Sequence, residues 1–210
     1  MTTFAPILIS FSFRVVSDQS LIGSGVAEII GERMKLETNR VGEVFATDEH
    51  RIGLKPVTRR VWAPIGERPV AHGHHRFHWL YVTAFASPAT GETFWYLSDG
   101  ISKPFFEAVL ETFAREAEAG LGRIILPGWH ANLKIPDGIR LIYLPPYTPE
   151  LQPAETLWSF VDQPIVNQHI ATIEELEAKI AQRCIALAEQ PEQIQSRTGF
   201  HWWPKRIAPN

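Results

Sequence analysis

The chain has 210 residues, a formal net charge of −3 at pH 7 and one cysteine, Cys184. Its length suffices for one substantial core, and a composition of 45% apolar and 20% charged residues excludes a disordered chain. The lone cysteine excludes an internal disulfide framework and suits a reducing cytoplasm, and no apolar run approaches the ~20 residues that span a bilayer.

The first 40 residues fit poorly with the rest of the chain. They hold an apolar start and one amphipathic stretch, for which we expect a short helix over about Val26–Leu36. The start lacks the basic region and the small-residue cleavage site of a signal peptide, so secretion is not expected. No DNA-reading helix-turn-helix is recognised there, and residues 1–40 are treated as an atypical, unassigned segment.

Strand patterns begin after residue 40. Glu43–Thr47 is predicted as a short strand that ends at two acids, Asp48 and Glu49, and Thr58–Gly66 as a second strand closed by a Pro-Ile-Gly turn. Phe77–Gly100 holds two β-rich runs around Pro-Ala-Thr-Gly-Glu, which predicts a hairpin.

A helix is predicted next. Ser102 can cap it, Pro104 suits its first turn because its missing N–H costs nothing there, and Gly120 ends it. The later predicted elements are two strands, Arg123–Leu126 and Ile139–Leu144, a helical stretch, Pro149–Phe160, and a helix that starts with a capping box at Thr172 and ends before Pro191.

This order of elements predicts the fold class. Antiparallel strands followed by helix-linked parallel strands make a mixed sheet with helices packed on it. We therefore predict an α/β protein with an RNase H-like mixed sheet flanked by helices.

Two acids stand where a metal site could be built. Asp48 is predicted at a strand end beside the sheet centre, and Glu155 at a helix start behind the prolines of "LPPYTPELQPAETLW". Mg²⁺ prefers oxygen ligands and takes one or two carboxylates besides phosphate and water. Each acid also has a structural explanation, because Asp48 could cap a turn and Glu155 could favour the helix dipole.

The motifs around these acids resemble a known family. "LIYLPPYTPELQPAETLW" resembles the third-acid motif of the DDE transposases of bacterial insertion sequences in the mariner superfamily, and "FATDEHRIGLKPVTRRVWAPIG" resembles their first-acid motif. The resemblance covers about Val41–Trp203. It implies an RNase H-like nuclease fold and two-metal phosphoryl transfer with Mg²⁺ or Mn²⁺. By position it makes Asp48 the first catalytic acid and Glu155 the third, both as metal ligands.

The second acid is missing from its expected place. In the family the strand before Gly-Trp-His ends in an Asp, whereas here Arg123–Leu126 runs directly into Pro127-Gly128-Trp129-His130. We interpret this as a short deletion across the active site, which predicts weakened metal binding and defective catalysis. Asp99 and Asp137 are the nearest acids, and Asp137 is the first candidate substitute. Because the start lacks the family's DNA-reading region, the chain is also expected to be truncated at its N-terminus.

A basic segment follows the first-acid motif. From Arg51 to Arg76 there are six basic residues and a single acid, a local net charge of +5. Such a block suits phosphate binding, although a solvated basic loop explains it equally well. The predicted DNA contacts are Arg51, Lys55, Arg59, Arg60 and Arg76. The histidines of "HGHH" lack partner cysteines, so we expect a loop near DNA rather than a zinc site, and Trp202-Trp203 is expected in the core more than on bases.

Together these patterns predict three regions: the unassigned residues 1–40, an RNase H-like DDE catalytic domain over 41–203, and a tail over 204–210. The predicted function is metal-dependent cleavage and transfer of DNA strands in transposition, in a catalytically defective form with weakened Mg²⁺ or Mn²⁺ binding. The expected partner is double-stranded DNA of transposon ends, in the cytoplasm and associated with the nucleoid; a homodimer is left open and no membrane is involved. The alternative is a non-catalytic DNA-binding or dimerising remnant that modulates intact transposases.

Overall fold

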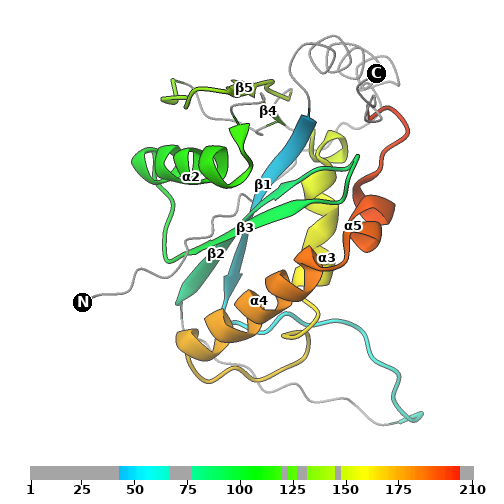
Figure 1. Ribbon diagram of the computed structural model, residues 1–210. Helices are drawn as coiled ribbons and strands as arrows, with labels where there is room; N and C mark the ends of the chain where they lie inside the picture. Colours follow the sequence, from blue (N-terminus) through cyan, green and yellow to red (C-terminus); the bar gives the residue numbers. More distant parts are fainter. Residues whose placement is uncertain (1–42, 67–76, 120–122, 127–131, 145–147, 204–210) are drawn as a thin grey trace.

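A mixed sheet organises the chain in the computed structural model, which describes residues 43–66, 77–119, 123–126, 132–144 and 148–203 (Figure 1). In these residues the sheet has five strands in the order β3-β2-β1-β4-β5. The antiparallel strands are β1 (Glu43–Gly53), β2 (Trp79–Ala86) and β3 (Thr93–Ser98), and the strands parallel to β1 are β4 (Arg123–Leu126) and β5 (Ile139–Leu141). The predicted α/β mixed sheet flanked by helices is confirmed.

Helices cover both faces of the sheet (Figure 1). On one face α2 (Lys103–Glu116) packs Phe113 edge-on against Phe45 of β1, with ring centroids 5.1 Å apart. On the other face lie α3 (Trp158–Val161), α4 (Ile173–Ala188) and α5 (Pro191–Thr198). Successive side chains of a strand point to opposite faces, so the odd-numbered residues of β1 meet α2 and the even-numbered ones meet the other helices.

The predicted helix starts are confirmed by their caps. The Ser102 hydroxyl accepts a hydrogen bond from the Phe105 N–H at 3.3 Å, and the Thr172 hydroxyl accepts one from the Glu175 N–H at 3.2 Å. The apolar stripe of α4 is buried as its spacing predicts, through Leu176, Ile180, Cys184 and Leu187. Burial raises the pKa of Cys184 to about 12, so this thiol is inert.

The segment predicted as one helix over Pro149–Phe160 is instead two 3₁₀ turns, η2 (Pro149–Leu151) and η3 (Pro153–Leu157), followed by the short α3. Pro149 and Pro153 have no N–H to donate to an earlier carbonyl, so they interrupt a continuous α-helix. α5 was not predicted; its mean hydropathy is low, and Ile194 is its one buried aliphatic side chain.

Three strand predictions differ from the structure. β5 ends at Leu141 and not at Leu144. β1 does not end at Asp48 but continues to Gly53, because β2 pairs with it as far as Gly53↔Trp79. Residues 58–66 form no strand. They belong to residues 54–66, here called the arm, which extend away from the sheet without a partner strand in the described part of the chain (Figure 1). A β-prone sequence does not become a strand without a partner.

Trp202 and Trp203 are buried, in a small cluster with Val44, Ala46 and Ile142, so the core role expected for this pair is confirmed. None of the helices in the described residues combines the length and apolarity needed to cross a membrane. The helix predicted over Val26–Leu36 and the histidines of "HGHH" lie outside those residues.

Candidate active site

Asp48 lies in the middle of β1, on the sheet face covered by η3 and α3. The residue is 6% exposed, and its Oδ2 accepts a hydrogen bond from Nε1 of Trp158 at 2.7 Å. Burial raises the pKa of Asp48 well above its ordinary value, and the neighbouring Glu155 raises it further. A charged carboxylate is therefore costly here unless a cation accompanies it.

Glu155 reaches the same place from η3. The Gln152 side-chain amide donates to the carbonyl oxygen of Thr47 at 2.8 Å, which ties the start of η3 to β1 one residue before Asp48. Burial raises the pKa of Glu155, while the Trp158 hydrogen bond and the charge of His50 lower it. The Trp158 indole N–H thus lowers the pKa of both carboxyl groups. Asp48 and Glu155, the two acids that the sequence motifs indicate, therefore lie beside the same side chain.

A second layer of side chains supports that indole. The His50 ring stacks on Trp158 with centroids 5.0 Å apart and an interplanar angle of 12°. His50 Nε2 lies 2.9 Å from Oδ1 of Asp162, and because a carboxylate only accepts, Nε2 carries the proton of that hydrogen bond. His50 and Asp48 are two residues apart on one strand, so both project toward α3.

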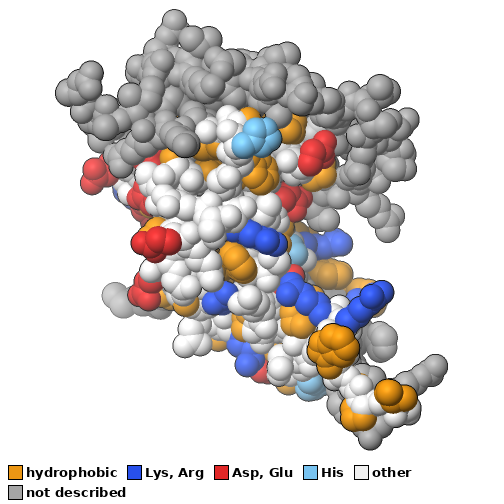
Figure 2. All heavy atoms as spheres, turned by 90° about the vertical axis from the view of Figure 1, so that its right-hand side faces the viewer, with side chains coloured by type: hydrophobic (Ala, Val, Ile, Leu, Met, Phe, Trp, Pro, Cys, Tyr) orange, Lys and Arg blue, Asp and Glu red, His pale blue; other side chains and the backbone are white. Residues whose placement is uncertain are grey.

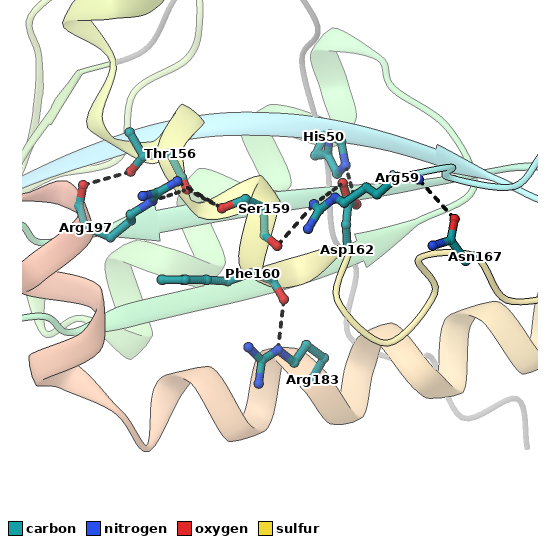
Figure 3. Close-up of polar contacts among 9 residues, drawn as sticks. All are labelled: His50, Arg59, Thr156, Ser159, Phe160, Asp162, Asn167, Arg183 and Arg197. Atoms are coloured by element: carbon teal, nitrogen blue, oxygen red, sulfur yellow. Dashed lines mark hydrogen bonds and ion pairs between the residues drawn. The ribbon is translucent and has the colours of Figure 1, made fainter. Parts of the chain in front are cut away.

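Asp162 also contacts the arm. Nη2 of Arg59 lies 3.8 Å from Oδ2 of Asp162 and donates to the Ser159 carbonyl oxygen at 3.3 Å (Figure 3). The backbone of the arm is held as well, since the Arg59 N–H donates to Oδ1 of Asn167 at 3.0 Å and the Asn167 N–H donates to the Val57 carbonyl at 2.9 Å. Contacts therefore lead continuously from the arm through Asp162, His50 and Trp158 to Asp48.

The acid pair has the donor chemistry of a divalent-cation site. Two neighbouring carboxylates disfavour each other's charge, and a cation between them reverses that repulsion. No ion pair between described residues involves Asp48 or Glu155. These residues fit one oxygen-preferring ion. Within the same part of the chain no group of three His, Cys, Asp or Glu side chains is placed to hold a metal.

Comparison with known sequences decides the family. The sequence model of the DDE superfamily endonuclease family matches residues 43–177, which include both acids. The chain belongs to this family. It is also 30% identical over 139 residues to the uncharacterized protein y4pE/y4sA of Sinorhizobium fredii (strain NBRC 101917 / NGR234), a match that covers 61% of this chain and 98% of the relative.

Solved structures support the fold. The mariner Mos1 paired-end complex with Mg has a TM-score of 0.56 at 12% identity, over 91% of this chain and 65% of that chain. The Mos1 transposase paired-end complex with the left transposon end has a TM-score of 0.51 at 13% identity, over 91% and 68%. This DDE endonuclease domain therefore spans about two thirds of the Mos1 chains and shares their RNase H-like architecture.

From the sequence motifs, the second DDE acid is expected just after β4. β4 runs parallel to β1, with Ala46 opposite Leu126, so β4 ends two residues short of the level of Asp48. The residues that follow, 127–131, lie outside the described part of the chain. The sequence there contains no acid.

Neither alternative acid stands at that position. Asp137 precedes β5, whose first residue is in register with Arg123 and Glu43, so Asp137 lies beyond the end of the strands opposite to Asp48. At about 3.3 Å per residue, the offset along the strands is roughly 20 Å. Asp99 follows β3, two strands away from β1. The structure thus rules out Asp137 as the substitute ligand in this conformation.

The predicted DNA contacts are separated by the fold. Arg51 projects from the α2 face of β1, opposite to Asp48, with its guanidinium 4.4 Å from the centroid of the Trp79 ring. Lys55, Arg59 and Arg60 lie on the arm and are exposed, but only Arg59 is tied to α3. Figure 2 shows Lys and Arg side chains gathered on the face that carries α5 and the arm. Arg76 lies outside the described residues.

Sequence patterns missed three members of the site. Trp158 was recognised only as part of a motif, although its place three residues after Glu155 puts it on the next turn. His50 was overlooked because β1 was predicted to end before it; the period of two along a longer strand would have placed it beside Asp48. Asp162 has no sequence signal, since only the fold brings it to His50.

Proposed function

We propose that this chain is the catalytic domain of a DDE transposase, that it binds double-stranded DNA and a divalent cation, and that it does not cleave or join DNA strands as it stands. The observation that carries this proposal is the convergence of Asp48 and Glu155 on Trp158. It is supported by the acid-free sequence that follows Leu126, Pro127-Gly128-Trp129-His130.

Asp48 and Glu155 would hold one Mg²⁺ or Mn²⁺, because such ions bind through oxygen and need few protein ligands. A bound ion of this kind neutralises phosphate charge and stabilises the attacking and leaving oxygens of an in-line displacement. The chain's own part is to keep the buried Asp48 carboxylate and the half-buried Glu155 carboxylate together beside Trp158. Without a second DDE acid this pair binds an ion weakly and leaves a second ion without its ligand. A loss of several kcal/mol of stabilisation lowers the rate about a thousand-fold or more.

The DNA contact is proposed for the arm and the face beside it. Lys55 and Arg60 are exposed there, and phosphate contacts of this kind weaken as salt rises. Mos1 transposase, which shares this fold, has been captured with its left transposon end. Association with the nucleoid would follow from such DNA binding.

Restoring the missing acid tests the proposal. The unmodified chain is compared with a variant that carries Asp-Asn-Ala inserted after Leu126, and with a matched variant that carries Asn-Asn-Ala. Each is incubated with Mg²⁺ or Mn²⁺ and duplex DNA from the ends of the element with native flanks, and nicking is measured. We expect nicking only from the Asp insertion. Nicking by the unmodified chain that Asp48→Ala or Glu155→Ala abolishes would show that the site is intact.

A second candidate function, a dimerising remnant that modulates intact transposases, is favoured by the surface of the arm. Val61, Trp62 and Ile65 are exposed, Trp62 and Ile65 fully so. Apolar side chains displayed together on an extended segment suit burial against another chain. Sedimentation velocity of the chain and of a Trp62→Ser/Ile65→Ser variant tests this: a dimer that becomes a monomer supports it, and a monomeric unmodified chain contradicts it.

A further inference from the structure

We propose that Trp158 is a positioning residue of the acid pair, whose indole N–H sets the orientation of the Asp48 carboxylate for a divalent cation. The inference rests on the proposed cation site and adds to it a residue that would not touch the ion. Nε1 of Trp158 donates to Oδ2 of Asp48 over 2.7 Å, in a buried setting. Each carboxylate oxygen has two lone pairs, so Asp48 can keep this hydrogen bond while it binds an ion.

The kind of donor matters at this position. Trp offers one N–H, accepts nothing and carries no charge. Beside the buried Asp48 carboxylate and the half-buried Glu155 carboxylate it favours the ionised forms, because a hydrogen bond donated to a carboxylate lowers its pKa. A Lys or Arg in its place would also favour ionisation, but its positive charge would repel the incoming cation. A neutral donor prepares the site without that competition.

The indole is itself held rigidly. Trp158 is 6% exposed, and it begins α3 directly after η3, so its ring bridges the helix that carries Glu155 and the strand that carries Asp48. The His50 ring stacks on its face, and Asp162 fixes His50. Arg59 approaches Asp162 from the arm (Figure 3). Hydrogen-bonded partners of metal-binding groups orient them in this way, and their loss weakens metal affinity by about ten- to a hundred-fold.

The test compares two Trp→Phe substitutions. Trp158→Phe keeps a ring against His50 and removes only the donor, whereas Trp95→Phe is the matched control, because Nε1 of Trp95 donates to the Thr93 hydroxyl at 2.9 Å on β3. Mn²⁺ affinity is measured by electron paramagnetic resonance, and thermal unfolding is measured without metal. We expect Trp158→Phe to weaken Mn²⁺ binding about tenfold or more and Trp95→Phe to leave it unchanged. Equal Mn²⁺ affinity in the unmodified chain and Trp158→Phe would overturn the positioning role alone.

A second measurement is made on the unmodified chain. Trp158→Phe is used only to assign the indole resonance of Trp158. In a ¹⁵N–¹H spectrum of the indole groups, paramagnetic Mn²⁺ should broaden the Trp158 resonance at concentrations that leave the Trp95 resonance sharp. Asp48→Asn should shift the Trp158 resonance in the metal-free chain, and Asp137→Asn should not. If Mn²⁺ binds with the same affinity to the Asp48→Ala/Glu155→Ala variant, the proposed cation site is wrong, and the positioning role is overturned with it.

Discussion

Burial acts against the charge of both Asp48 and Glu155, and the neighbouring Glu155 acts further against the charge of Asp48. A cation site nevertheless needs both carboxyl groups in their charged forms. The pKa of each group is raised in the folded chain, by burial first and, for Asp48, by Glu155 next. Folded chains therefore keep these protons to higher pH than unfolded chains do. Because protonation and folding are linked, the contribution of these acids to stability depends on pH. It falls as pH rises from about 4, the ordinary pKa of a carboxyl group, through the raised pKa of the folded chain. Metal-free chains are destabilised at neutral pH by the groups that would bind the metal.

Substitution of Asp48 by Asn should consequently stabilise the metal-free chain at pH 7.5. The amide is neutral and its oxygen can still accept from Trp158, so we expect an increase of about 1 kcal/mol or more in the free energy of unfolding. The gain should shrink as pH falls toward 4, where the Asp48 carboxyl is protonated in the folded chain and about half protonated in the unfolded chain. Urea unfolding at several pH values measures it, with the exposed Asp137→Asn as control. A less stable Asp48→Asn chain at pH 7.5 would contradict this account of the site.

At the scale of elements, the site depends on pieces that are distant in sequence. Gln152 ties η3 to β1, Arg59 ties the arm to α3, and α5 supports η3 through Arg197, whose Nε donates to the Thr156 carbonyl oxygen at 3.3 Å. Nε of Arg183 donates to the Phe160 carbonyl oxygen at 2.9 Å, so α4 and α5 each add a hydrogen bond to a carbonyl of η3 or α3 (Figure 3).

Arg59 and Arg60 should behave differently, although they are neighbours in the basic segment. Arg60→Ala should lower DNA affinity and reduce the slope of its salt dependence by about one phosphate contact, without loss of stability. Arg59→Ala should also loosen the arm, at a cost of about 0.5–1 kcal/mol because its partners are partly exposed. Fluorescence anisotropy over a salt series and thermal unfolding measure the two effects. Equal stability of the two variants would show that the contacts of Arg59 with α3 contribute nothing.

The turn between β2 and β3 contains a glycine, Gly91, whose substitution should lower the stability of the chain. Gly91 has φ +77°, and a Cβ there would lie 2.1 Å from the Pro191 carbonyl oxygen at the start of α5. Gly91→Ala must strain the turn and push α5 away, and we expect a loss of about 2 kcal/mol or more. Gly100→Ala is the control, since nothing lies within 4 Å of its added Cβ. Thermal unfolding measures the stability of both variants. If Gly91→Ala is as stable as the unmodified chain, α5 can move away without cost, contrary to this prediction.

At the scale of the whole molecule, local sequence patterns predicted the elements whose limits are set by nearby residues. Caps and apolar spacing located α2 and α4, and the turn chemistry located the hairpin of β2 and β3. The sequence could not show that β1 continues past Asp48, because its pairing partner lies about thirty residues away along the chain. It also could not show that Asp162 meets His50. The acid pair was found through motifs, while the residues that support it were found only in three dimensions.

The most direct test of the account is the location of Mn²⁺ in crystals by anomalous scattering. We expect a single peak between Asp48 and Glu155, with a carboxylate oxygen of each as ligand, and an Asp48 carboxylate that keeps its hydrogen bond to Trp158. A second, neighbouring peak should appear only when an Asp is restored after Leu126. Absence of any peak at this pair, with Mn²⁺ bound elsewhere in the chain, would contradict the central claim that these two acids are what remains of a DDE metal site.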